Sequence, residues 1–237
     1  MSGDPQALRG LLDNLRCRRR LGLSLVRGGP AQLKSLLALA TGQPASAPAA
    51  PLDLDQPSLE ALDLALADCQ RCPLSASRRR VVFGAGPAKA SLMIIGEAPG
   101  AQEDQQGLPF VGPAGQLLDR MLAAVGLKRQ EAYITNIVKC RPPSNRDPQP
   151  AEAAACRPFL EAQVRAVAPR AICTLGRPAS QALLASDAPI SALRGRWHDF
   201  QGIPLLPTFH PAFLLRDPAR KSEAYRDLKA LARSVLT

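Results

Sequence analysis

The sequence predicts an α/β protein in which a central, mainly parallel four-stranded sheet lies between two layers of helices. Two observations support this prediction. Short apolar runs alternate with stretches of helical periodicity from Ser58 onward, and both have the lengths that are typical of strands and helices in βα units. In such sheets ligands bind at the carboxyl ends of strands, so the loops that follow the strands are the place to look for function.

The elements follow in a regular order. A first helix is expected over residues 58–69, SLEALDLALADC, with Ser58 as its N-cap and apolar residues at helical spacing. The four expected strands cover residues 91–98, 131–140, 171–176 and 203–210. The helices expected between and after them cover residues 115–127, 151–168, 178–184 and 222–235. This alternation places helices on both faces of the sheet, which gives three layers.

Residues 1–57 differ from the rest of the chain. The stretch TGQPASAPAAPLDLDQP, residues 41–57, is rich in Pro and Ala and has no apolar periodicity, which is typical of a flexible or extended linker. Residues 1–50 also hold seven Lys and Arg residues against two Asp. We therefore expect a basic N-terminal extension and linker over residues 1–57, followed by one domain over residues 58–237.

The charge balance narrows the range of partners. Thirty Lys and Arg residues against twenty Asp and Glu give a formal charge of +10, which favours a polyanion such as nucleic acid. The sequence lacks a run of about 18 apolar residues and the pattern of a secretory signal. We therefore expect a cytoplasmic protein without a membrane partner.

The cysteines suggest a bound group, because thiols in a reducing compartment are metal ligands or catalytic groups more often than disulfide partners. Four of the six cysteines have the uneven spacing C-x2-C followed by C-x15-C: Cys69, Cys72, Cys140 and Cys156. This spacing leaves an iron-sulfur cluster, a zinc site and buried thiols as alternatives. Cys173 lies in the middle of an expected strand and is most simply a core residue.

Three loops carry a combination that resembles a known family. GEAPGAQEDQQGLPFVGPAG, ITNIVKCRPPSNRDP and LPTFHPAFLLR, in this order and with the four cysteines, resemble the family 4 uracil-DNA glycosylases over about residues 65–235. The resemblance implies a monomeric DNA repair enzyme that hydrolyses the N-glycosidic bond of deoxyuridine in single- or double-stranded DNA. It also implies that Cys69, Cys72, Cys140 and Cys156 hold one structural 4Fe-4S cluster.

The resemblance assigns residues to the base pocket. Phe110 would stack on a flipped uracil, and the Asn136 amide would offer a donor and an acceptor to uracil O4 and N3–H. Cytosine presents the inverse pattern and would leave these groups unpaired. A core Phe and a turn-forming Asn are the plain alternatives.

The resemblance also assigns the catalytic groups. His210 would donate a hydrogen bond to O2 of the departing uracil, and Glu97 would stabilise the positively charged sugar and orient the water. Ala98 stands where the related GQDP branch has an aspartate, so the role in holding the water is inferred for Glu97. Glu103 is expected near the C5 edge of the base, where it would help to exclude thymine.

DNA contacts are expected from two loops. The polar loop Ser144, Asn145 and Arg146 suits phosphate contacts, and Asn145 is also counted among the substrate-binding residues. In HPAFLLR, Leu214 best matches the position of an intercalating wedge, with Arg216 beside it, although this apolar run would also suit a buried helix.

Two other functions fit parts of the pattern. A non-catalytic, cluster-bearing DNA-binding or damage-sensing protein would keep the cysteines, the charge and the fold, but the presence of Phe110, Asn136 and His210 argues against it. A variant that captures uracil-DNA covalently would need a histidine-bearing insertion, which the stretch CRPPSNRDP lacks.

Overall fold

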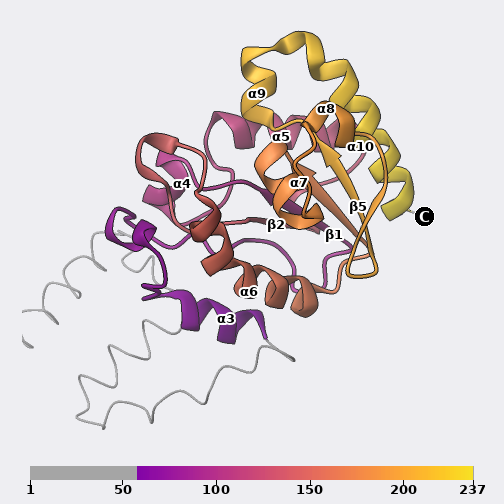
Figure 1. The fold of residues 1–237 in the computed structure, drawn as a ribbon. Helices are drawn as coiled ribbons and strands as arrows, with labels where there is room; N and C mark the ends of the chain where they lie inside the picture. Colours follow the sequence, from indigo (N-terminus) through magenta and orange to yellow (C-terminus); the bar gives the residue numbers. More distant parts are fainter. Residues whose placement is uncertain (1–57, 237) are drawn as a thin grey trace, which may run out of the picture. The chain divides into compact units, whose positions relative to one another are not determined.

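The computed structural model describes residues 58–236, and the extension and linker expected over residues 1–57 lie outside them. One five-stranded sheet has the order β2-β1-β3-β5-β4 (Figure 1). Its strands are β1 (Leu92–Gly96), β2 (Ala132–Asn136), β3 (Ala171–Leu175), β4 (His198–Phe200) and β5 (Ile203–Thr208). The four expected strands are confirmed and pair in parallel, whereas β4 is an additional antiparallel edge strand.

The helices alternate with the strands as expected, with short helices added in the loops. The α-helices are α3 (Leu59–Leu66), α4 (Ala101–Gln106), α5 (Pro113–Ala123), α6 (Pro150–Val167), α7 (Arg177–Leu184), α8 (Ile190–Leu193), α9 (Pro211–Arg216) and α10 (Lys221–Leu236). The 3₁₀ helices are η1 (Pro73–Ala76), η2 (Arg129–Glu131), η3 (Pro143–Asn145) and η4 (Pro218–Arg220). Within residues 58–236, no helix is both long enough and apolar enough to cross a bilayer.

The layers follow from the alternation of side chains along β1. Met93 and Ile95 pack into a core with residues of α6 and α7, whereas Leu92 and Ile94 pack into a core with residues of α5 and α10. Successive side chains of a strand point to opposite faces, so the sheet is covered by helices on both sides. Beyond α6 lies α3, which buries Leu62 against it. The predicted three-layer architecture is confirmed.

The missed strand β4 forms a hairpin with β5 through the two residues Gln201 and Gly202. Both have a positive φ, 54° and 82°, as the tight turns that suit the twist of a hairpin require. The sequence signal for such a turn is strongest for Asn-Gly or Asp-Gly, and Gln-Gly departs from it. With only three residues in β4, little alternation was available to reveal the strand.

The topology places the functional loops at one edge of the sheet. The chain runs from β1 to β2 on one side and then returns to β3 on the other side of β1. Such a switch point leaves a crevice at the carboxyl ends of the strands. The loops after β1, β2, β3 and β5 all begin at this edge, because these strands are parallel.

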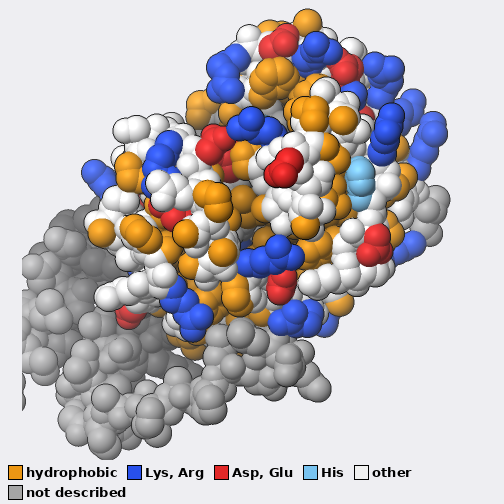
Figure 2. Space-filling view, in the orientation of Figure 1, with side chains coloured by type: hydrophobic (Ala, Val, Ile, Leu, Met, Phe, Trp, Pro, Cys, Tyr) orange, Lys and Arg blue, Asp and Glu red, His pale blue; other side chains and the backbone are white. Residues whose placement is uncertain are grey.

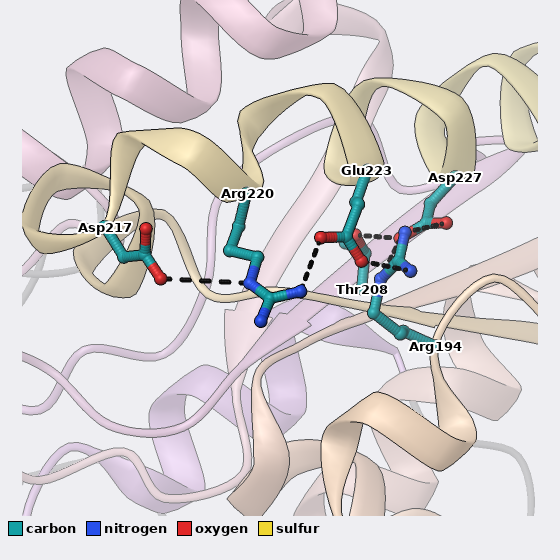
Figure 3. A network of polar contacts seen from close by, with 6 residues as sticks. All are labelled: Arg194, Thr208, Asp217, Arg220, Glu223 and Asp227. Atoms are coloured by element: carbon teal, nitrogen blue, oxygen red, sulfur yellow. Dashed lines mark hydrogen bonds and ion pairs between the residues drawn. The ribbon is translucent and has the colours of Figure 1, made fainter.

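A network of ion pairs, in which Asp227 is buried, fixes the end of β5 to α10 (Figure 3). The Arg194 guanidinium donates from Nη2 to Asp227 Oδ1 at 2.7 Å and from Nη1 to Glu223 Oε2 at 3.0 Å. Thr208, the last residue of β5, donates from Oγ1 to Asp227 Oδ2 at 2.7 Å. The network therefore holds the backbone two residues before His210.

Replacing Arg194 by Met should lower the free energy of unfolding by about 2–4 kcal/mol at pH 7, because it leaves the buried Asp227 carboxylate without its cation. Burial raises the pKa of Asp227, so its carboxyl protonates readily as the pH falls and the deficit should shrink toward pH 5. Urea unfolding at the two pH values measures both effects. Arg157→Met, which removes an exposed ion pair with Glu161, is the control and should cost less than about 1 kcal/mol. An equal deficit at both pH values would contradict the role given to Asp227.

Candidate active site

A cavity of about 380 Å³ opens at the carboxyl edge of the sheet, where the crevice was expected. It is lined by residues from the loops after β1, β2 and β5. Most of the predicted catalytic, substrate and DNA-binding residues are among them: Glu97, Ala98, Glu103, Phe110, Asn136, Asn145, Arg146, His210 and Arg216. Sequence positions as far apart as 97 and 216 are thus brought to one site.

The floor of the cavity depends on Gly96, the last residue of β1. A Cβ atom at this position would lie 2.5 Å from both Asn136 Oδ1 and Phe110 Cζ, which is closer than real Cβ atoms approach. Only glycine therefore lets the Phe110 ring and the Asn136 amide meet over the strand end. Phe110 itself has a φ of 51°, a left-handed conformation that costs energy for an aromatic residue.

Two side chains hold Phe110 in this conformation. Arg129 donates from Nη1 to the carbonyl of Phe110 at 3.0 Å and from Nη2 to the carbonyl of Pro109 at 2.6 Å. Glu103 Oε1 accepts from the backbone amides of Val111 and Gly112, both at 2.8 Å. Glu103 was expected at the C5 edge of the base, but its observed contacts fix the Phe110 loop. Sequence reasoning missed Arg129, which lies nineteen residues from Phe110 and in no motif.

The Asn136 side chain is buried and keeps an unused acceptor. Among buried side-chain nitrogen and oxygen atoms in the described part of the chain, Asn136 Oδ1 is the one without a hydrogen-bond partner. Leaving such an atom unpaired costs about 1–3 kcal/mol, so proteins rarely keep one without a use. Asn136 lines the cavity, so a donor on a bound molecule is the candidate partner for this atom.

His210 caps α9, and this contact sets its tautomer. Its Nδ1 accepts from the backbone amide of Ala212 at 3.1 Å, so the neutral ring carries its proton on Nε2. Burial and, to a lesser extent, the positive charge of Arg216 lower the pKa of His210 to about 4, against the opposing negative charge of Glu103. The ring is therefore neutral at pH 7 and lies 5.6 Å from the Phe110 ring, centroid to centroid.

The second histidine has a different environment. His198 lies on β4, and its Nε2 contacts the carbonyl of Leu193 at 3.1 Å. It is not among the residues that line the cavity. The sequence reasoning that preferred His210 as the active-site histidine thus agrees with the position of both rings.

Glu97 is half-buried in the cavity beside Asp147. Burial raises the pKa of Glu97 to about 7, and the negative charge of Asp147 and a side-chain hydrogen bond with it act in the same direction. The positive charge of Arg177 opposes this shift. Asp147 was not among the predicted site residues, although it lies in the NRDP stretch of the second loop.

The second loop is held to α6 rather than left free. Arg146 forms a bidentate ion pair with the buried Glu152, from Nη1 to Oε2 at 2.9 Å and from Nη2 to Oε1 at 2.6 Å. Asn145 Oδ1 accepts from Arg141 Nε at 2.8 Å. Arg146 was expected to contact phosphate, and its observed contacts are structural, so a phosphate contact stays a prediction.

The prediction of Leu214 as the wedge is wrong. Leu214 is fully buried and packs with Leu117, Phe209 and Ala224. The next residue, Leu215, is 43% exposed. One residue along a helix turns the side chain by about 100°, so α9 buries one leucine and presents the other to solvent. Arg216, beside Leu215, lines the cavity.

The formal charge of +10 favours a polyanionic partner. Lys and Arg side chains are scattered over the face drawn in Figure 2, and acidic side chains lie among them. The Lys and Arg residues that line the cavity are Arg146, in the loop after β2, and Arg216, in α9. Contacts with a polyanion are thus expected from separate points rather than from one stripe.

The four spaced cysteines line one small pocket, which shares no lining residue with the cavity. Cys69 and Cys72 follow α3, Cys140 comes four residues after β2, and Cys156 lies on α6. The second strand, which was expected to reach Cys140, ends at Asn136. Cys173 lies elsewhere, in the core on β3, as expected.

Cationic side chains surround these thiols. Arg71, Arg78 and Lys139 also line the pocket, and Arg78 donates from Nη1 to Cys140 Sγ at 3.4 Å. Lys139 is fully buried and donates from Nζ to Thr135 Oγ1 at 2.6 Å and to the carbonyl of Asn136 at 2.7 Å. This lysine connects the thiol pocket to the strand end that carries Asn136.

The donor set suits a group that binds thiolates. Burial raises the pKa of the Cys140 and Cys156 thiols, so their charged forms need compensation from a bound group and from the nearby cations. Four cysteines with uneven spacing are the usual ligands of an iron-sulfur cluster. Within residues 58–236, the side chains do not form a site for a single metal ion, because no three His, Cys, Asp or Glu residues converge on one point.

Comparison with known proteins gives a consistent result. The sequence profile of the Uracil DNA glycosylase superfamily matches residues 83–229. The Type-4 uracil-DNA glycosylase of Pyrobaculum aerophilum is 42% identical over 179 residues, which cover 72% of this chain and 91% of that protein. The enzymes of the same name from Sulfurisphaera tokodaii and Thermotoga maritima are 39% and 44% identical, covering 76% and 63% of this chain and 86% and 79% of their own lengths.

Replacing Glu97 by Gln should stabilise the protein at alkaline pH. The raised pKa means that the folded state resists ionisation, so Glu97 reduces stability increasingly as the pH rises from 4.5 to about 7. With allowance for solvent screening of a half-buried group, E97Q should be about 1–2 kcal/mol more stable at pH 8 and nearly unchanged at pH 4. Thermal unfolding at both pH values measures this, with the exposed Glu131→Gln as control. A gain that is independent of pH would contradict the assigned cause.

Proposed function

Because the chain belongs to the uracil DNA glycosylase superfamily, we propose that the cavity beside Phe110 binds a deoxyuridine flipped out of DNA. The protein is a DNA repair enzyme that excises uracil. It hydrolyses the N-glycosidic bond and leaves an abasic site. The observation that carries the assignment of the cavity is the buried, unpaired Asn136 Oδ1 next to the Phe110 ring.

Base recognition follows from these two side chains. An enzyme that acts on a stacked base must extrude it, and an aromatic face then holds the flat base. Asn136 Oδ1 would accept from uracil N3–H, and the amide nitrogen would donate to O4. Cytosine carries an acceptor at N3 and a donor at C4, so it would leave the same buried groups unpaired.

Departure of the base would depend on His210. The C1′–N1 bond breaks with its electron pair on uracil, and the developing negative charge reaches O2. His210 carries its proton on Nε2, because Nδ1 is occupied by the Ala212 amide. A donor that is already oriented stabilises this charge without reorganisation during the reaction.

The sugar side of the reaction would depend on Glu97. As the base departs, positive charge builds on the deoxyribose, and a carboxylate close by stabilises it. The water then bonds to C1′ and gives its proton to Glu97, whose pKa of about 7 suits a base at neutral pH. Ala98 offers no second carboxylate at the next position.

We further propose that Cys69, Cys72, Cys140 and Cys156 hold one 4Fe-4S cluster, as the resemblance implies. Bound there, the cluster would cross-link α3, the end of the β2 segment and α6. The buried thiols and the cations around them support this assignment. A reducing, cytoplasmic compartment suits such thiolates. The enzyme is proposed to act as a monomer on uracil in single- or double-stranded DNA.

The excision of uracil is tested with a uracil-containing oligonucleotide, alkaline treatment and analysis of strand cleavage. The unaltered protein should cleave the strand at the uracil. His210→Ala should reduce the single-turnover rate about 10²–10³-fold, since it removes one donor to the leaving base. His198→Ala, the matched control on β4, should keep the rate. An intact strand with the unaltered protein would overturn the enzyme assignment, and a protein–DNA species that resists denaturation would indicate covalent capture instead.

We propose Leu215 as the wedge that fills the gap left by the flipped base. It is the exposed leucine of α9 and precedes Arg216 on the cavity wall. Leu215→Ala should slow excision from double-stranded DNA about tenfold but leave single-stranded DNA nearly unaffected, because only the duplex has to be opened. Leu214→Ala should instead lower the free energy of unfolding by about 2–5 kcal/mol. Equal effects of L215A on both substrates would contradict the wedge role.

A further inference from the structure

The carboxyl groups of Glu97 and Asp147 meet on the wall of the cavity. Glu97 comes from the loop after β1 and Asp147 from the loop after β2, and both line the cavity. Their side chains are hydrogen-bonded to each other. Burial, the negative charge of Asp147 and this hydrogen bond all favour the protonated form of Glu97.

Asp147 is held in this position from the other side. Arg177, the first residue of α7, donates from Nη2 to Asp147 Oδ2 at 2.9 Å. The Asp147 carbonyl also accepts from Arg146 Nη1 at 3.0 Å, and Arg146 is itself tied to Glu152. The placement of Asp147 thus depends on contacts with two helices rather than on a free loop.

Asp147 also reaches solvent by a second route. Its side chain is 60% exposed, and it lines a neighbouring cavity of about 420 Å³ between α6 and α7 as well as the active-site cavity. A flipped nucleotide would fill the first cavity and separate Glu97 from solvent there. The second cavity has different walls, made of residues such as Leu160, Leu183 and Phe200.

We propose that Asp147 is a positioning residue for the reaction: it holds the Glu97 carboxyl by a hydrogen bond once Glu97 has taken the proton of the attacking water, and it passes that proton to solvent. The proposal rests on the proposed glycosylase function. As the water oxygen bonds to C1′, its proton goes to the Glu97 carboxylate. The hydrogen bond between the two carboxyls then carries a proton to Asp147, which releases it into the second cavity. The electron pair of the broken bond leaves with uracil.

Apart from Arg216, the other charged groups on the cavity wall have partners or are neutral. Glu103 accepts from the amides of Val111 and Gly112, and Arg146 is paired with Glu152. His210 is neutral above pH 5 because burial lowers its pKa to about 4. Arg216 lines the cavity and acts on His210. The groups that act directly on the Glu97 carboxyl are therefore Asp147 and Arg177.

The test compares three variants of the full chain. Asp147→Asn removes the carboxyl that contacts Glu97, and Arg177→Met removes the cation that is paired with Asp147. Asp187→Asn is the matched control. Asp187 also lines the second cavity, so its replacement removes one negative charge from the same region without touching Glu97. The single-turnover excision rate is measured from pH 5 to pH 9, and the Glu97 carboxyl is titrated by NMR in glutamate-labelled protein without DNA.

In the unaltered protein the rate should rise with pH through about 7, together with the titration of Glu97. In D147N both transitions should move down by about one pH unit or more, because the like charge is gone. In R177M both should move up, and in D187N neither should move. Opposite shifts from two neighbouring replacements would not arise from a general loss of structure.

The outcomes separate this inference from the function on which it rests. If active D147N shows the same rate profile and the same Glu97 titration as the unaltered protein, the role of Asp147 is overturned and the glycosylase function stands. If the unaltered protein excises no uracil at any pH, the function fails and the catalytic role of the pair fails with it. If the rate profile and the Glu97 titration both shift to lower pH in D147N, the role of Asp147 is supported.

Discussion

The active site depends on the close approach that Gly96 permits at the end of β1. Without a side chain there, the Phe110 ring and the Asn136 amide share a space that one methyl group would fill. The rest of the site supports this contact. Phe110 needs a left-handed backbone, which Arg129 and Glu103 hold in place through hydrogen bonds to the chain on both sides of it. These local costs in stability are offset by the two apolar cores that cover the faces of the sheet.

Burial favours the neutral forms of the two side chains proposed to be catalytic, so it moves their pKa values in opposite directions. It lowers the pKa of His210, so the ring is a neutral donor, and it raises the pKa of Glu97, so the carboxyl titrates near neutrality. In each case a neighbour of like charge strengthens the effect, Arg216 for the histidine and Asp147 for the glutamate. The same desolvation that makes the cavity suitable for a base therefore also adjusts the groups that would act on it.

Much of this arrangement could be predicted from the sequence, because buried strands read as apolar runs and the carboxyl ends of parallel strands meet at one edge. Gly96, Asn136 and His210 lie at or just after strand ends, where the loops indicated a site. The failures have physical reasons. Three adjacent apolar residues do not reveal which one a helix buries, so Leu214 was chosen where Leu215 is exposed. Contacts of Arg129 with Phe110 and of Asp147 with Glu97 depend on tertiary structure and leave no local signal.

The cysteine pocket and the active site share one segment of chain. Cys140 precedes the loop that carries Asn145, Arg146 and Asp147, and Cys156 follows it on α6. Lys139 reaches from the thiol pocket to the carbonyl of Asn136, and the Arg146–Glu152 pair fixes the loop to the first turn of α6. A group bound to the four thiols would therefore hold both ends of this loop while remaining outside the cavity. Its contribution would then be to the placement of Asn136 and Asp147, on which the proposed reaction depends.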